Sequence, residues 1–209
     1  MKDFDVSLYL VTDRNLLKAG RDFYDAVEES LQNGVTMLQL REKDISSREF
    51  YEIAKRLKDI AAKYRIPFII NDRIDIALSI DADGVHLGQE DLPCSIARKI
   101  MGDNKIIGIS AGCVDEAVEA ERDGADYIGA GAVFYTGTKK DIGEAIGLLN
   151  LKEIKDAVKI PVVAIGGIKY SNAPDVMRTG VDGISVVSEI MASDDIGFAT
   201  RRLRDAISK

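Results

Sequence analysis

Short apolar runs rich in β-branched residues alternate along this chain with longer stretches of helical period, and the runs recur about every 26 residues. Alternation of this kind produces parallel strands joined by right-handed crossovers. The predicted strands are Leu8–Thr12, Met37–Arg41, Pro67–Asn71, Gly84–Leu87, Ile106–Ser110, Tyr127–Ala130, Pro161–Ile165 and Gly183–Val187. Eight such units predict the α/β class and a single (β/α)8 TIM barrel, formed by one domain over residues 1–209.

An open, doubly wound parallel sheet is the competing architecture. Such sheets usually carry a glycine-rich dinucleotide-binding turn after the first strand. Here the turn is Val11-Thr12-Asp13-Arg14-Asn15, without glycine. The barrel is therefore the favoured fold.

The stretches between the strands predict amphipathic helices. One apolar face with a period of about 3.6 residues consists of Phe50, Ile53, Ala54, Leu57, Ile60 and Ala61. Ser46 and Glu49 have the spacing of a capping box at the start of that helix. Asn150 and Glu153 predict a similar start for a later helix.

Composition limits where the chain works and what it binds. The only cysteines are Cys94 and Cys113, too few for a disulfide scaffold, and the formal net charge is −7. No long apolar run or signal peptide is evident. We expect a soluble cytoplasmic protein that binds neither nucleic acid nor membrane. A homo-oligomer stays open, because the helix face at Phe198 and Leu203 could pack on the barrel or on a second subunit.

In a (β/α)8 barrel the chemistry lies at the carboxyl ends of the strands. After the second predicted strand, Gln39, Arg41 and Lys43 share one face by the strand period of two. Arg and Lys at the mouth of an acidic protein favour an anion such as phosphate. The structural alternative is a solvated strand end at which Arg41 pairs with Glu42 or with a neighbouring acid.

Carboxylates follow the third and fourth strands, in Asn71-Asp72 and Gln89-Glu90-Asp91. Two carboxylates from adjacent strand ends can share Mg²⁺, which also takes water and phosphate oxygens. The structural alternatives make Asp72 a helix N-cap and Asp91 a turn residue. Together at one mouth, they favour a magnesium site.

Ser110 ends the fifth strand, and no catalytic triad accompanies it, because His86 is the only histidine. We therefore interpret Ser110 as a ligand contact rather than a nucleophile. His86 is either structural or faces the substrate. The segment Phe134–Lys140 has the composition of a mobile lid.

The last two strands end in Ile165-Gly166-Gly167-Ile168 and Val186-Val187-Ser188-Glu189. Small residues there let the backbone approach a phosphate monoester closely. Two anion sites would thus face each other across one mouth. This pattern predicts the joining of two phosphorylated substrates with pyrophosphate as the leaving group.

From Leu8 to Ile190 the sequence resembles the thiamine-phosphate synthase family. The matching segments are Tyr9–Asp13, Gln39–Lys43, Ile70–Asp72, Gly84–Pro93, Thr136–Lys139, Ile165–Ile168 and Val187-Ser188. The resemblance implies a barrel that couples a hydroxymethylpyrimidine diphosphate to a thiazole phosphate.

The same resemblance implies roles for individual residues. Those that would hold the pyrimidine diphosphate are Gln39, Leu40, Arg41, Glu42, Lys43, Asn71, Ser110 and Lys139, of which Arg41, Lys43, Ser110 and Lys139 would be catalytic. Those that would seat the thiazole phosphate are Thr136, Gly137, Thr138, Gly167, Val187 and Ser188. Asp72 and Asp91 would ligate Mg²⁺.

The chain departs from the family pattern next to the predicted lid. Ala132 stands where a proline is expected, and Tyr135 stands where a proline or small residue is usual. Two other interpretations keep the same pocket: a thiazole tautomerase-like barrel and a ligand-sensing regulatory protein. The tautomerase-like barrel would not need the complete set of diphosphate-binding and metal-binding residues, and the regulatory protein would bind ligand without releasing pyrophosphate.

Overall fold

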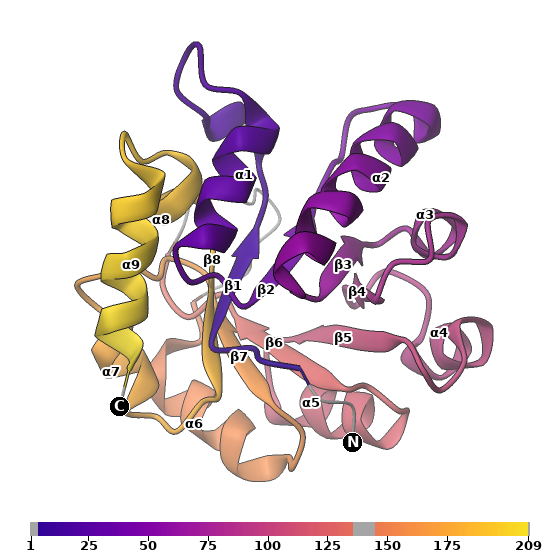
Figure 1. The fold of residues 1–209 in the computed structure, drawn as a ribbon. Helices are drawn as coiled ribbons and strands as arrows, with labels where there is room; N and C mark the ends of the chain where they lie inside the picture. The colour runs from indigo at the N-terminus through magenta and orange to yellow at the C-terminus, as the bar shows by residue number, and fades with distance from the viewer. Residues whose placement is uncertain (1–3, 136–144, 209) are drawn as a thin grey trace.

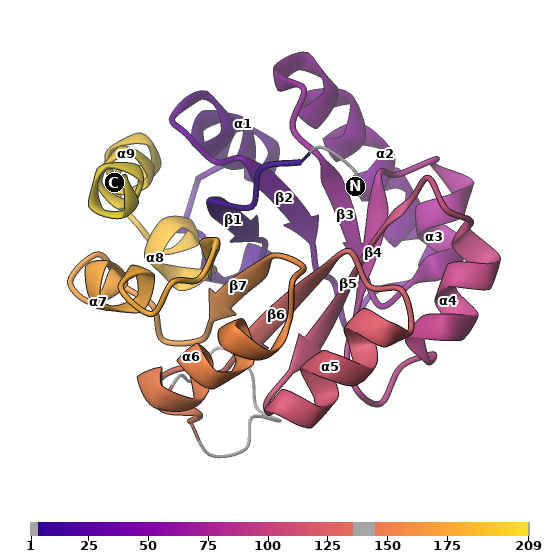
Figure 2. The same cartoon turned by 90° about the horizontal axis from the view of Figure 1, so that it is seen from below.

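The strands of this chain close into a barrel. The computed structural model describes residues 4–135 and 145–208, and within these ranges eight parallel strands pair in chain order, with β1 paired to β8. The helices lie around the outside of the strands in both Figure 1 and Figure 2. The predicted (β/α)8 TIM barrel is therefore confirmed.

The strand bounds agree with the predicted ones to about one residue at each end. They are β1 (Leu8–Val11), β2 (Met37–Leu40), β3 (Phe68–Asn71), β4 (Gly84–Leu87), β5 (Ile106–Ala111), β6 (Tyr127–Gly131), β7 (Val162–Ile165) and β8 (Gly183–Val186). The helices are the 3₁₀ turn η1 (Arg14–Leu16), α1 (Phe23–Gln32), α2 (Ser47–Tyr64), α3 (Ile74–Ser79), α4 (Cys94–Met101), α5 (Val114–Arg122), α6 (Gly147–Ala157), α7 (Ala173–Met177), α8 (Ser188–Met191) and α9 (Ile196–Ile207).

Successive residues of each strand face alternately the helices and the barrel interior. Outward residues such as Leu10, Leu38 and Ile70 belong to the large apolar core between the strands and the helices. A second core, near the amino ends of the strands, consists of Val6, Tyr9, Met37, Ile69, Ile106, Tyr127 and Val163. Gln39, Asn71 and Ser110 lie above this core, toward the carboxyl ends of their strands.

The helix starts confirm one local prediction and correct another. In α2 the six predicted face residues are buried, and the Ser46 hydroxyl accepts a hydrogen bond from the Glu49 N–H at 3.2 Å. The start predicted at Asn150 is wrong, because α6 begins at Gly147 without a side-chain cap. Hydrogen bonds from the N–H groups of residues 146 and 147 to the carbonyls of residues 132 and 133 fix that earlier entry.

The exposure of α9 and the lengths of the helices concern two expectations, a second subunit and a membrane. Leu203 of α9 is fully buried in the core, whereas Phe198 keeps 55% of its surface exposed. The predicted face of α9 is thus divided between the barrel and solvent. None of the helices in the described ranges combines the length and the apolar character that a membrane crossing requires.

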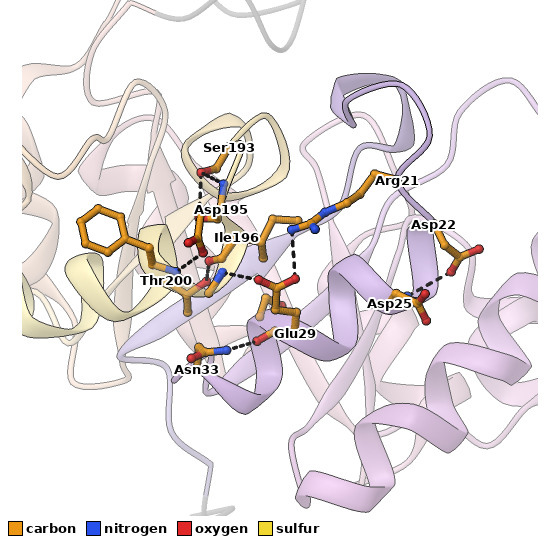
Figure 3. A network of polar contacts seen from close by, with 12 residues as sticks. Arg21, Asp22, Asp25, Glu29, Asn33, Ser193, Asp195, Ile196 and Thr200 are labelled. Atoms are coloured by element: carbon orange, nitrogen blue, oxygen red, sulfur yellow. Dashed lines mark hydrogen bonds and ion pairs between the residues drawn. The ribbon is translucent and has the colours of Figure 1, made fainter.

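A polar network ties the last helix to the first (Figure 3). The Glu29 carboxylate of α1 accepts hydrogen bonds from Arg21 Nη2 at 2.9 Å and from the Gly197 N–H of α9 at 2.8 Å. Asp195 caps the same helix by accepting from the Phe198 N–H at 2.7 Å. Because the first N–H groups of a helix have no partner inside it, Glu29 acts as a second cap supplied by another helix.

We expect Glu29→Ala to lower the free energy of unfolding by about 1–2 kcal/mol, because the Gly197 N–H and the Arg21 guanidinium lose their shared acceptor. Glu29→Gln should lower it less, since the amide oxygen still accepts from Gly197. Urea unfolding followed by circular dichroism measures both changes. The control Glu52→Ala, at an exposed position of α2, should stay within about 0.5 kcal/mol, and an equally small effect of Glu29→Ala would contradict the capping role.

Candidate active site

Polar side chains collect where the strands end at one mouth of the barrel. Gln39 near the end of β2 and Asn71 at the end of β3 are both buried, and Ser110 faces inward near the end of β5. Arg41 and Lys43 follow β2. In (β/α)8 barrels this end carries the active site, so the structure brings these five predicted residues to the expected place.

Asp72 follows β3 in an uncommon backbone conformation, with φ of +60°. This left-handed region is costly for most L-residues, and aspartate is among those that tolerate it best. The Asp72 N–H donates to the His86 carbonyl at 2.9 Å, and the Arg73 N–H donates to the Asn71 carbonyl at 2.7 Å. Because α3 begins at Ile74 without a side-chain cap, Asp72 is not the N-cap of that helix.

Two carboxylates and an ammonium group converge beside this turn. Lys43 Nζ donates to Asp72 Oδ2 at 3.0 Å, and Asp91 Oδ2 accepts from the Gly88 N–H at 2.7 Å. Burial raises the pKa of Asp91, against the lowering effect of the Gly88 N–H, and the neighbouring Asp72 carboxyl raises it further. The Asp72 and Asp91 carboxyl groups are therefore close neighbours. Asp91 also accepts a hydrogen bond within its own turn, from Gly88, as expected if it were only a turn residue.

The donor chemistry of this pair fits a hard divalent cation. Mg²⁺ is commonly bound by one or two carboxylates and keeps its other positions for water and phosphate oxygens. Among residues 4–135 and 145–208, no group of three or more His, Cys, Asp or Glu side chains is arranged to hold a metal. Asp72 and Asp91 thus offer a two-carboxylate site that leaves room for substrate oxygens, rather than a closed protein cage.

Glu42 pairs with Arg14 in η1, the turn that follows β1. Arg14 Nη2 donates to Glu42 Oε2 at 3.1 Å, and Arg14 Nε lies 2.8 Å from Glu42 Oε1 without hydrogen-bond geometry. Burial raises the pKa of Glu42 despite this pairing. Leu40 packs into the outer apolar core. A ligand in the mouth could therefore meet Leu40 and Glu42 through their backbone, and Arg14 is a partner that the sequence did not suggest.

This pairing also decides the alternative proposed for Arg41. Glu42 is engaged by Arg14, and no ion pair holds the Arg41 guanidinium among the residues that the structure describes. The Arg41 N–H donates to the buried Thr12 hydroxyl at 3.2 Å, which fixes the backbone at the end of β2. The role of the Arg41 guanidinium as an anion contact stays a prediction.

The glycines after β7 are explained first by packing. Gly166 and Gly167 have φ of +98° and +65°. A Cβ at Gly166 would lie 2.5 Å from Ala132 Cβ, and one at Gly167 would lie 2.7 Å from Phe134 Cβ. The loop after β6 therefore fills the space beside both glycines, and the predicted close approach of a phosphate concerns their backbone only.

The loops after β7 and β8 are tied together. The Tyr170 N–H donates to Glu189 Oε1 at 3.0 Å, and Asn172 Nδ2 donates to the Gly167 carbonyl at 3.0 Å. Val187 and Ser188 stand at the start of the short α8. These contacts place Gly167, Val187 and Ser188 on neighbouring loops of the same mouth.

Of the predicted lid, Phe134–Lys140, the structure describes Phe134 and Tyr135, which lie against Gly167. Thr136, Gly137, Thr138 and Lys139 lie outside the described residues, and their roles stay predictions.

The sequence analysis missed two tyrosines inside the barrel. Tyr9 of β1 and Tyr127 of β6 hydrogen-bond through their hydroxyls at 2.8 Å, and the Tyr127 hydroxyl lies 2.9 Å from His86 Nδ1. The sequence offered one indication of these buried rings, namely a glycine at an inward position of the strand next to Tyr127. A Cβ at Gly108 would lie 2.0 Å from Tyr127 Cζ.

Fold and site together define the class of protein. A (β/α)8 barrel with basic residues and paired carboxylates at its mouth is an enzyme scaffold for phosphorylated small molecules. The family model described as "Thiamine monophosphate synthase" matches residues 8–190. The chain belongs to this family, and the chain is an enzyme.

Known relatives agree over nearly the whole chain. A thiamine-phosphate synthase of Clostridium novyi is 58% identical over 201 residues, covering 96% of this chain and 98% of the relative. One of Clostridium tetani is 54% identical, with 97% and 96% coverage. The solved structure of thiamine phosphate pyrophosphorylase from Pyrococcus furiosus is 46% identical, with a TM-score of 0.88 and coverage of 97% and 95%.

The two cysteines take no part in the charge pattern of the mouth. Both are free, Cys94 buried in α4 and Cys113 exposed after β5. Burial raises the pKa of the Cys94 thiol to about 11. Because the thiolate is the nucleophile, Cys94 is protected both by its protonation and by its position.

We therefore predict that a disulfide reagent modifies one thiol of the folded protein rapidly and both thiols in guanidinium. Cys113→Ser should remove the rapid phase, and Cys94→Ser should leave it intact. Absorbance of the released thiolate measures the stoichiometry. Two rapidly reacting thiols in the folded protein would contradict the burial of Cys94.

Proposed function

We propose that this enzyme couples 4-amino-2-methyl-5-(diphosphooxymethyl)pyrimidine with thiazole phosphate to give thiamine phosphate and pyrophosphate. The observation that carries the proposal is the convergence of Lys43, Asp72 and Asp91 at the ends of β2, β3 and β4, in a chain of this family. Arg41 follows the same strand as Lys43, and its guanidinium makes no ion pair with any described residue. A barrel that only bound thiazole phosphate would not need this cationic and anionic set.

The diphosphate would lie against the β2 and β3 ends. Arg41 and Lys43 supply positive charge there, and the Asn71 amide supplies hydrogen-bonding groups close to them. Charge-assisted hydrogen bonds to phosphate are stronger than neutral ones. We place Lys139 in the same role by resemblance, and it is one of the residues that the structure does not describe.

Asp72 and Asp91 would hold Mg²⁺, which when bound would neutralise part of the diphosphate charge. The position of Lys43 against Asp72 supports this assignment, because one basic group can then contact both a ligating carboxylate and the diphosphate. The metal itself remains a prediction.

The thiazole phosphate would lie at the β7 and β8 ends. Gly167, Val187 and Ser188 offer backbone N–H groups and a hydroxyl there, a chemistry that suits a phosphate monoester. By resemblance, Thr136, Gly137 and Thr138 would complete this binding site.

The family reaction is dissociative, and the residues present suit it. The bond between the pyrimidine methylene carbon and the diphosphate oxygen breaks, and its electron pair leaves with pyrophosphate. The thiazole nitrogen then donates its lone pair to the resulting pyrimidinylmethyl cation. Arg41 and Lys43 would stabilise charge on the leaving group as it develops, so no protein nucleophile is required.

Three further predictions concern the setting of the enzyme. We infer a cytoplasmic location from the two free cysteines, and one domain over residues 1–209 from the pairing of β1 with β8. A homo-oligomer is the third of these predictions, because the exposed Phe198 side chain could pack against a second subunit.

Pyrophosphate release tests the proposed function directly. Purified protein should release pyrophosphate only when both substrates and Mg²⁺ are present, and EDTA should abolish the release, because the carboxylate pair then lacks its cation. A coupled colorimetric assay measures the product. No release, with thiazole phosphate still binding in calorimetry, would instead support the tautomerase-like or the ligand-sensing interpretation.

We expect Asp72→Asn to reduce the rate of coupling by more than about 100-fold. Loss of a residue that only supports a metal ligand costs roughly 10- to 100-fold, and a metal ligand itself should cost more. Thiazole phosphate binding should be nearly unchanged, because that site lies at other strand ends. The matched control is Asp75→Asn on α3, whose exposed carboxylate pairs with Arg73 just before that helix. Equal loss of coupling and of thiazole phosphate binding would refute the assigned metal site.

A further inference from the structure

A continuous line of polar side chains crosses the interior of the barrel beneath the mouth. Gln39 Nε2 of β2 donates to the Tyr9 hydroxyl of β1 at 2.7 Å, and the Tyr9 and Tyr127 hydroxyls lie 2.8 Å apart. His86 Nδ1 of β4 lies 2.9 Å from the Tyr127 hydroxyl, and His86 Nε2 lies 3.0 Å from Ser110 Oγ of β5. We call these five residues the relay.

The barrel is built to accommodate the relay. A Cβ at Gly108 would lie 2.0 Å from Tyr127 Cζ, and a Cβ at Gly129 would lie 2.9 Å from His86 Cε1. Two inward positions thus lack side chains where the two central rings of the relay need space. The Tyr9 and Tyr127 rings pack edge to face, with centroids 5.8 Å apart.

Burial keeps both phenols protonated. Both tyrosines are fully buried, and burial raises the pKa of each far above its usual range. Each hydroxyl therefore has one proton to donate and accepts through its oxygen. A buried proton without an acceptor is costly, so the protons in the relay must point in one consistent direction.

The direction follows from the amide end. The Gln39 amide nitrogen can only donate, so the Tyr9 oxygen is its acceptor and the Tyr9 proton must go to Tyr127. No other acceptor for this proton exists among the described residues, and the buried Ser185 hydroxyl, whose residue pairs with Tyr9 in the β1–β8 ladder, makes no hydrogen bond.

The remaining steps follow in turn. Tyr127 donates to His86 Nδ1, so the imidazole proton lies on Nε2 and is donated to Ser110 Oγ. The hydroxyl proton of Ser110 is then free to point away from His86.

We propose that the relay fixes His86 as the Nε2–H tautomer and thereby positions Ser110 as a hydrogen-bond donor toward the substrate. Tyr9, Tyr127 and His86 are positioning residues, since they act through Ser110. The two ends of the relay then offer opposite hydrogen-bonding groups. The Gln39 amide oxygen can accept a hydrogen bond, and the Ser110 hydroxyl can donate one. The tautomer stands on the relay alone, and the role toward substrate rests on the proposed function.

The tautomer can be measured in the free protein because His86 is the only histidine. Long-range ¹H–¹⁵N correlation spectra should show a protonated Nε2 and an unprotonated Nδ1. In Tyr127→Phe the Nδ1 resonance should shift, because it loses its donor. The matched control is Tyr64→Phe, which removes a hydroxyl bonded to Gln32 and Glu28 on the outer helices and should leave the His86 signals unchanged.

A protonated Nδ1 in the unmodified protein would reverse the relay and overturn the proposal. An Nδ1 resonance that does not move in Tyr127→Phe would also overturn it. If that variant does not fold, the tautomer of the unmodified protein still decides, since its measurement needs no substitution.

Kinetics test the step through Ser110. Tyr127→Phe should lower kcat/KM for the pyrimidine diphosphate about tenfold, the value of roughly one hydrogen bond, while KM for thiazole phosphate stays unchanged. In a Ser110→Ala background the same substitution should have no further effect. Equal losses in both backgrounds would refute a role through Ser110. A protein that released no pyrophosphate would refute the proposed function and leave the tautomer result standing.

Discussion

Backbone hydrogen bonds between β1 and β8 join the first strand to the last, and the mouth exists because of this closure. An open sheet would leave two unpaired edges and would spread its strand ends along a line. In the closed barrel the same ends form a ring, which brings Lys43, Asp72 and Asp91 to one side and Gly167 to another. The chemistry of the site is thus a result of topology before it is a result of any single side chain.

Closure also restricts what the interior can contain. The inward residues of eight tilted strands share a narrow space, so each large side chain requires small ones beside it. The Tyr127 ring fits because Gly108 has no side chain. Near the amino ends of the strands this space is filled mainly with apolar groups. Toward the mouth it contains polar groups, most of whose hydrogen bonds are made within the barrel.

Much of this architecture could be predicted because its signals are local. The strand period of two and the helical period in α2 depend on neighbours in sequence, so both were confirmed almost to the residue. The start of α6 could not be predicted from Asn150, since tertiary hydrogen bonds to residues 132 and 133 set it.

The site was predictable in composition but not in detail. That Asp72 and Asp91 would be neighbours followed from adjacent strand ends, whereas the left-handed backbone of Asp72 depends on a carbonyl of another strand. The partners Arg14 and Glu42, and the hydroxyl contact of Tyr9 with Tyr127, join residues far apart in sequence. No local pattern specifies such pairs.

The packing of Gly166 and Gly167 against residues 132–135 has a consequence for engineering. Because no Cβ fits at either glycine, the two loops occupy one shared volume at the β6 and β7 ends. A loop grafted from another barrel at only one of these positions would collide with the loop that remained. Exchange of the loops after β6 and β7 in this scaffold therefore requires both segments to be transferred together.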